Sequence, residues 1–140
     1  MMQNRSLIED YLTRCEHRLA AIELLFERKS WADVVRESQE VVELALKALL
    51  RFSNIEVPRI HEPGDILIDN QSRCPKKIKE FIPRLSQISR ELRRDRELAF
   101  YGSEDLTPGE FYKEPDAKKA KESAAWVLKT IKEALFKKTF

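Results

Sequence analysis

Hydrophobic residues between positions 31 and 52 recur at three- and four-residue steps, which is the period of an α-helix. The stripe consists of Val34, Ser38, Val41, Ala45, Ala48, Leu49 and Phe52. Leu44, Leu46 and Leu50 fall outside it, so the second half of the segment is apolar around much of its circumference. A surface helix has one apolar face and one charged face. We therefore predict a central helix that packs on more than one side, in an all-α bundle or also against a second copy of the chain.

The preceding segment, from about residue 4 to residue 29, also has a helical pattern. Its apolar positions alternate steps of four and three, as on a bundle helix: Ile8, Leu12, Cys15, Leu19, Ile22 and Phe26. His17 lies off this stripe and is expected at the surface. Ser30 is expected to cap the next helix, with Asp33 in its first turn. The short connection predicts that these two helices are antiparallel neighbours.

Prolines and a glycine interrupt the pattern after residue 54, where we expect a long loop with a short helical turn at residues 65–70. The next helix is predicted from residue 75 or 76 to residue 100. Pro83 either kinks this helix or marks the start of its regular part. Its buried stripe is Ile78, Phe81, Ile82, Leu85, Ile88 and Leu92.

The same helical count places Arg96 and Ala99 on the apolar side of this helix, and Arg94 and Tyr101 on the opposite side. A charged arginine at the end of an apolar stripe needs a carboxylate or a wet cleft. The candidate partners of Arg96 on the central helix are Glu37, Glu40 and Glu43.

The last helix is expected to begin with Asp116 as its cap and to end near residue 137. Its stripe is Ala117, Ala120, Ala124, Val127, Leu128, Ile131 and Leu135. No segment alternates convincingly as a strand would. We therefore predict a single all-α domain over residues 1–140.

Composition agrees with long helices and few tight turns, because 36% of the residues are charged and only 3 are glycine. No apolar run is long enough for a membrane span, and the first residues lack the layout of a secretion signal, so we expect a cytoplasmic protein. Cys15 and Cys74 lack metal-ligand spacing and are expected to be free thiols. We predict no metal site and no cofactor.

The net charge of +2 is too balanced for nucleic-acid binding by bulk charge, which leaves local clusters. One cluster is Arg90, Arg93, Arg94 and Arg96, and the other is Lys129, Lys132, Lys137 and Lys138. The arginines could hold phosphate oxygens, with Tyr101 stacking on a base. They fit equally well a structural cluster in which Arg96 pairs with glutamates and Tyr101 caps the bundle end. The lysines fit a solvated helix face.

Several common catalytic signatures are absent from the sequence, among them a glycine-rich phosphate loop, HExxH, CxxC and GxSxG. The only histidines are His17 and His61, so histidine-based acid–base catalysis has few candidates. His61 lies in the proline-rich loop, where it either packs against the following turn or takes part in a site.

Four motifs together resemble the HEPN domain family, named for higher eukaryotes and prokaryotes and for nucleotide binding. They are QEVVELALKALL (39–50), PRIH (58–61), DIL (65–67) and RELAFYG (96–102). Their order and spacing fit the family over nearly the whole chain, whereas the first and last helices fit only in type. The resemblance implies an up-and-down bundle of four or five helices, usually a homodimer that brings the ends of the fourth helices into a shared cleft.

Many members of the family are RNases, often toxins paired with a small nucleotidyltransferase antitoxin. Their motif is an arginine, a short spacer and a histidine, commonly followed by x-Tyr. When Tyr101 is set on that tyrosine, the histidine falls on Ala99 and the arginine on Arg94, or on Arg96 in the shorter R-x-x-A-x-Y form. Because a methyl group cannot transfer a proton, the resemblance implies the subgroup without the catalytic histidine. Phe100 departs from the R-x-x-A-D-Y-G pattern of such relatives.

We therefore predict a non-catalytic, toxin–antitoxin-related protein that binds a nucleotide, an RNA or a nucleotidyltransferase partner. The predicted site residues are Arg93, Arg94, Arg96, Tyr101 and His61. In some family pairs the nucleotidyltransferase adenylylates the tyrosine, so the resemblance makes Tyr101 a candidate acceptor. Two alternatives stay open: a divergent HEPN ribonuclease, for instance with His61 brought into the cleft, and a purely structural helical interaction domain.

Overall fold

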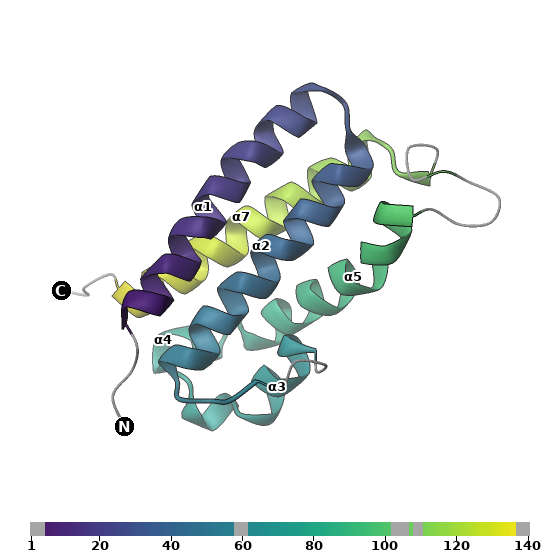
Figure 1. The fold of residues 1–140 in the computed structure, drawn as a ribbon. Coiled ribbons are helices and arrows are strands. Elements are labelled where there is room, and N and C mark those ends of the chain that lie inside the picture. The colour runs from purple at the N-terminus through teal and green to yellow at the C-terminus, as the bar shows by residue number, and fades with distance from the viewer. Residues whose placement is uncertain (1–4, 58–61, 102–106, 108–110, 137–140) are drawn as a thin grey trace.

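The computed structural model describes residues 5–57, 62–101, 107 and 111–136, with the backbone alone for residues 94–101. Within these residues every regular element is helical. The long helices are α1 (Arg5–Glu27), α2 (Trp31–Phe52), α5 (Ile82–Tyr101) and α7 (Glu114–Phe136), and the short elements are α3 (Pro63–Asp69), the 3-10 turn η1 (Gln71–Arg73) and α4 (Lys76–Lys79). Consecutive long helices run in opposite directions, which gives the expected up-and-down bundle (Figure 1).

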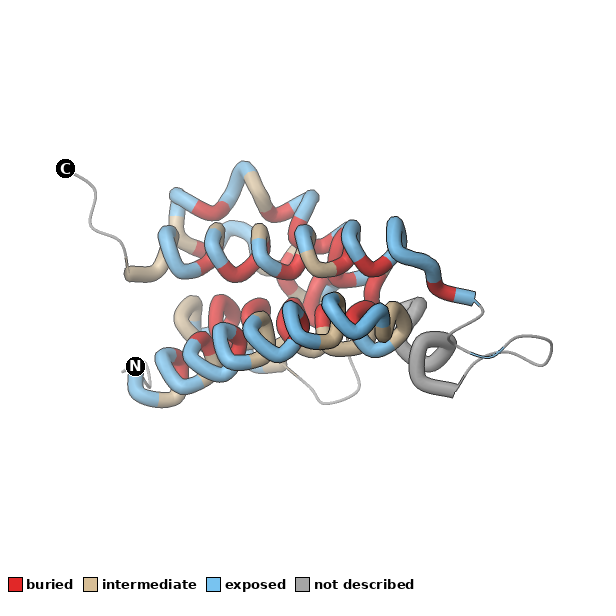
Figure 2. Tube along the Cα trace, turned by 90° about the horizontal axis from the view of Figure 1, so that it is seen from above, coloured by how far each residue is buried: buried red, intermediate tan, exposed pale blue. Residues whose placement is uncertain are grey.

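Helix α2 lies at the centre of the bundle and contacts α1, α3, α5 and α7. Its buried residues are Val34, Val35, Ser38, Gln39, Val41, Val42, Ala45, Leu46, Ala48, Leu49 and Leu50. The prediction of a central helix that packs on more than one side is confirmed. The predicted stripes of the other long helices also turn inward, as Figure 2 shows, with Leu19, Phe26, Phe81 and Leu135 only partly buried at the edge of the core.

Helices α1 and α2 are each followed, two residues after their last residue, by a residue with left-handed backbone, since φ is 60° at Lys29 and 59° at Asn54. After α1 the amide of Ser30 donates to the carbonyl of Leu25 at 2.9 Å, which is the bond of a Schellman turn. This turn reverses the chain within three residues, so α1 and α2 are the antiparallel neighbours expected from their short connection. Helix α2 ends at Phe52, slightly before residue 54, near which the sequence pattern predicts its end.

Two predicted helix caps are wrong in detail. Ser30 is the N-cap residue of α2, but its Oγ donates to Asp33 Oδ2 at 2.7 Å and does not bind a helix amide. Asp116 lies inside the first turn of α7, which begins at Glu114, and its Oδ2 accepts from the amide of Lys113 at 2.9 Å. In both places the strongest acceptor is the carboxylate inside the first turn, so that group determines the local bonding.

The helix predicted from residue 75 or 76 to residue 100 is divided into α4 and α5. Pro83 is the second residue of α5, where a helix needs no backbone donor. Of the two expected roles of Pro83, the start of the regular part is therefore confirmed. From there α5 continues without a break to Tyr101.

Cys15 and Cys74 are both buried and both free, as expected. None of the helices in the described part of the chain is long and apolar enough to cross a membrane.

Candidate functional site

The predicted site residues belong mainly to the C-terminal half of α5. Arg94, Arg96 and Tyr101 are part of this helix, but their side chains lie outside the described residues, as does the whole of His61. Because α5 is helical to its end, Arg94 and Tyr101 occupy the same side, about 10 Å apart along the axis. The pairing of Arg96 with a glutamate of α2 stays a prediction.

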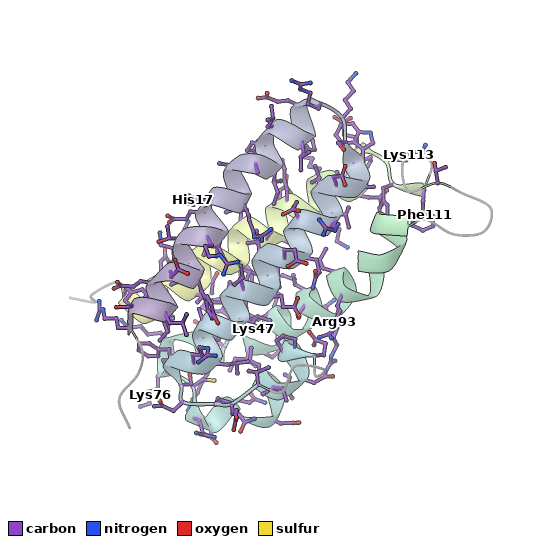
Figure 3. The ribbon with its side chains drawn as sticks, in the orientation of Figure 1. His17, Lys47, Lys76, Arg93, Phe111 and Lys113 are labelled. Atoms are coloured by element: carbon purple, nitrogen blue, oxygen red, sulfur yellow. The ribbon has the colours of Figure 1, made fainter. Side chains whose placement is uncertain are left out.

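Arg93 is the member of the predicted set whose side chain is described, and it lies against α2 (Figure 3). Its Nη1 is 3.7 Å from Glu43 Oε1, and only 17% of the Glu43 side chain is exposed. Glu43 Oε2 accepts a hydrogen bond from Gln39 Nε2 at 3.0 Å. Gln39 is buried, and its Oε1 has no hydrogen-bond partner among the described atoms. A buried acceptor without a partner is costly, so a donor that reaches this point would be stabilised.

Two polar contacts that the sequence did not predict hold α3 against α5. Arg90 Nε donates to Asp65 Oδ1 at 2.7 Å, and its Nη2 lies 2.6 Å from the same oxygen. Glu62 caps α3 by accepting from the amide of Asp65 at 3.2 Å, and it also accepts from Ser89 Oγ. Arg90 and Arg93 therefore each have a carboxylate partner within the fold, and their charges are partly compensated before any ligand arrives.

Gly64 allows the backbones of α3 and α5 to approach each other. A Cβ at this position would lie 3.0 Å from Ser86 O and 2.6 Å from Glu62 Oε2. The glutamate can move, but Ser86 O belongs to helix backbone. We expect Gly64→Ala to lower the free energy of unfolding by about 1–3 kcal/mol, because the two helices must separate or strain. Urea denaturation followed by circular dichroism at 222 nm measures the change.

The control for this substitution is Asp69→Ala, an exposed position on the same helix. It is expected to change stability by no more than about 0.5 kcal/mol. Equal stability of Gly64→Ala and Asp69→Ala would contradict the close packing of α3 on α5.

The other predicted basic and histidine positions lie away from this end of α5. Lys132 on α7 pairs with Glu16 of α1, and Lys129 is exposed on the same helix. The remaining two lysines of that cluster lie outside the described residues. His17 is exposed on α1, as predicted (Figure 3). Among the residues described, no three His, Cys, Asp or Glu side chains gather as metal ligands would.

A cavity of about 230 Å³, which the sequence did not predict, lies beside α5 and α7. Leu92 and Tyr112 form part of its apolar wall, and Glu91, Asp116 and Lys119 contribute charge. Tyr112 is 3% exposed, although it follows a segment that reads as a loop. With two carboxylates and one ammonium group, the cavity has no excess of positive charge for a phosphate. The arginines at the end of α5 remain the better candidate site.

Comparisons with known proteins agree with this architecture. The family model of the HEPN domain matches residues 8–134, from α1 to α7. A search of curated proteins found no match.

Among solved structures, the chain is similar to the crystal structure of an archaeal HEPN homologue. The two share 23% sequence identity with a TM-score of 0.65, and the match covers 97% of this chain and 100% of the other. At this level of identity the structural likeness shows a shared fold. Because the family model spans most of the chain, the protein belongs to the HEPN domain family.

Proposed function

We propose that this HEPN protein is a non-catalytic binding protein that holds a nucleotide or a single-stranded RNA at the C-terminal end of α5. The observation that carries the proposal is the unbroken helix through Arg94, Ala99 and Tyr101. The RNase motif of the family has a histidine at the place of Ala99, and a methyl group cannot act as an acid or a base. Arginine and tyrosine at the neighbouring places keep the means of binding, whereas the imidazole of the RNase motif is absent.

Within the arginine cluster, the fold supports a division of roles. Arg90 and Arg93 face Asp65 and Glu43 at 2.6 Å and 3.7 Å, so these two arginines help to fix α5 against α3 and α2. We assign ligand binding to Arg94 and Arg96, whose guanidinium groups can each donate two hydrogen bonds to a phosphate. The ring of Tyr101 can stack on a base.

The resemblance also implies an assembly, which we include in the proposal. Two chains form a homodimer in which the ends of both α5 helices share one cleft, and the dimer works with a minimal nucleotidyltransferase in a toxin–antitoxin-related pair. A shared cleft would double the number of guanidinium groups around one ligand. Multi-angle light scattering of the purified protein tests the dimer directly.

The binding test uses fluorescence anisotropy with a labelled single-stranded RNA and, separately, with a fluorescent ATP analogue. We expect Arg96→Ala and Arg94→Ala each to weaken binding by about tenfold, because each removes a charge-assisted contact to phosphate. Added salt should weaken binding further, since phosphate contacts release counterions. The matched control is Arg84→Ala, which removes an exposed arginine at the other end of α5 that stacks on Trp126 at 4.2 Å. It should leave the dissociation constant unchanged.

The same RNA is examined on a gel after incubation, and we expect it to remain intact. Cleavage that is lost in His61→Ala or Arg96→Ala would overturn the non-catalytic proposal and establish the divergent ribonuclease. Absence of binding to both ligands, with a folded protein by circular dichroism, would instead leave the structural interaction domain.

A further inference from the structure

The outer side of α1 presents an apolar centre with an exposed arginine toward each end, Arg14 and Arg28. Leu24 is 54% exposed, more than Phe111 at 43%, the other large apolar side chain exposed in the described part of the chain. Together with Ala21 and Leu25 it forms the floor of an open groove of about 500 Å³. Arg14 and His17 lie at its rim, and Figure 3 shows His17 on α1. We call this surface, formed by the outer side of residues 14–27 of α1 and by Arg28 directly after it, the α1 face.

The positive charge of the α1 face follows from how the bundle uses the acidic residues of α1. Glu23 Oε1 lies 2.7 Å from Lys121 Nζ, and Glu16 pairs with Lys132. Both lysines belong to α7, so these carboxylates are directed to the flank of α1 that meets α7. The carboxylate that lines the groove on the outer side is Glu37 of α2, which is already paired with Arg18 and Arg36 at 2.7 Å and 2.9 Å.

The cations of the α1 face include two that are free to meet a partner. The side chains of Arg14 and Arg28 are exposed and make no hydrogen bond or ion pair within the described residues. Arg18, by contrast, is opposed by Glu37 at 2.7 Å. Arg14 lies two helical turns before Ala21, and Arg28 lies about one turn after Leu24, directly after the last residue of α1.

We propose that the α1 face binds an acidic amphipathic helix of a partner protein. An apolar stripe on that helix would cover Leu24 and Leu25, and carboxylates on its flanks would reach Arg14 and Arg28. A second copy of this chain fits poorly, because a two-fold axis through Ala21 would bring Arg14 of one copy against Arg28 of the other. A nucleic acid also fits poorly, because the centre of the surface is apolar and offers no hydrogen-bond donor to a phosphate group.

The test is a titration of ¹⁵N-labelled protein with a synthetic helical peptide of about 16 residues, with leucines at helical spacing and glutamates on both flanks. We expect amide shifts confined to α1 and the adjoining part of α2. Leu24→Glu should weaken binding by about tenfold or more, because it places a charge at the centre of the contact. Arg14→Glu should weaken it by a similar factor and reduce its salt dependence.

The matched controls change the same chemistry elsewhere. Phe111→Glu alters the other exposed large apolar side chain, and Lys129→Glu reverses an exposed charge on α7. Both should bind the peptide like the wild type, and circular dichroism confirms that all four variants are folded.

Results of three kinds would overturn the proposal. The first is equal binding of a peptide in which lysines replace the glutamates, or no binding of either peptide at millimolar concentration. The second is a homodimer that dissociates in Leu24→Glu, which would make a second copy the occupant. The third is a labelled RNA that shifts the same amides as the acidic peptide. None of these outcomes depends on ligand binding at α5, so the two proposals stand or fall separately.

Discussion

Replacement of Leu46 by alanine is expected to lower the free energy of unfolding by about 3 kcal/mol, within the range of about 2–5 kcal/mol typical of fully buried leucines. Leu46 has no exposed surface and belongs to α2, which contacts every other long helix. Its truncation removes apolar area from the core and leaves a cavity that the surrounding helices can fill only in part. Urea denaturation followed by circular dichroism at 222 nm gives the difference.

Leu24→Ala is the matched control, because it removes the same atoms from a side chain that is 54% exposed. We expect it to change stability by no more than about 0.5 kcal/mol. If the two variants unfolded at the same urea concentration, Leu46 would not be part of a close-packed core, and the central position of α2 would be wrong.

The position of α2 could be predicted from the sequence because burial on several sides requires apolar residues on several sides. Leu44, Leu46 and Leu50 depart from the single stripe of Val34 and its helical neighbours, and this departure alone indicated more than one packing partner. Leu44 proved to be only partly buried, whereas Leu46 and Leu50 have no exposed surface. The long helices followed from the same periodicity, with errors of a few residues at their ends.

The errors at helix ends have a common physical cause. A side chain can bond the start of a helix either from the N-cap position or from inside the first turn, and the sequence does not show which of the two occurs. At Ser30 the hydroxyl donates to Asp33, and at α7 the carboxylate of Asp116 reaches back to Lys113. The left-handed conformations of Lys29 and Asn54 were also not predicted, because neither residue is glycine.

The candidate site was predicted less completely than the fold because its contacts join distant segments. Glu43 was one of three candidate partners of Arg96, a pairing that stays a prediction, whereas its contact with Arg93 was not predicted. The pair Arg90–Asp65 joins residues 25 positions apart, a relation that helical periodicity cannot supply. The charge of the α1 face has the same origin, since it depends on lysines of α7 that lie about 100 positions away along the chain.

The buried thiol of Cys15 gives the second large effect, which depends on pH. Burial raises the pKa of Cys15 from 9.0 to about 12, although the nearby Arg18 and Arg14 lower it in part. Its Sγ lies 3.5 Å from the carbonyl oxygen of Val41 in the core, where it donates the thiol proton. The folded state therefore keeps this proton at a pH at which the unfolded chain has lost it.

The sign of the effect follows from this difference in bound protons. The contribution of Cys15 to stability is complete below pH 9, and it decreases between pH 9 and about 12, because ionisation then favours the unfolded chain. The slope is about 1.4 kcal/mol per pH unit in this window. Raising the pH from neutrality to about 10.5 should therefore cost the wild type about 2 kcal/mol through this group.

The measurement compares urea denaturation of the wild type and Cys15→Ala at pH 7 and at about pH 10.5, both in the presence of a reducing agent. Other groups also ionise in alkali, but they do so in both proteins, so their effect cancels in the difference. Cys15→Ala should be less stable than the wild type at pH 7, because it leaves a small cavity, and should gain about 2 kcal/mol relative to the wild type at the higher pH. Cys74→Ala should show the same direction with a smaller change, since burial also raises the pKa of Cys74 but its sulfur has a neighbouring hydroxyl at Ser53. A difference between wild type and Cys15→Ala that stayed constant with pH would mean that the thiolate is solvated in the folded state, and Cys15 would then lie outside the dry core between α1 and α2.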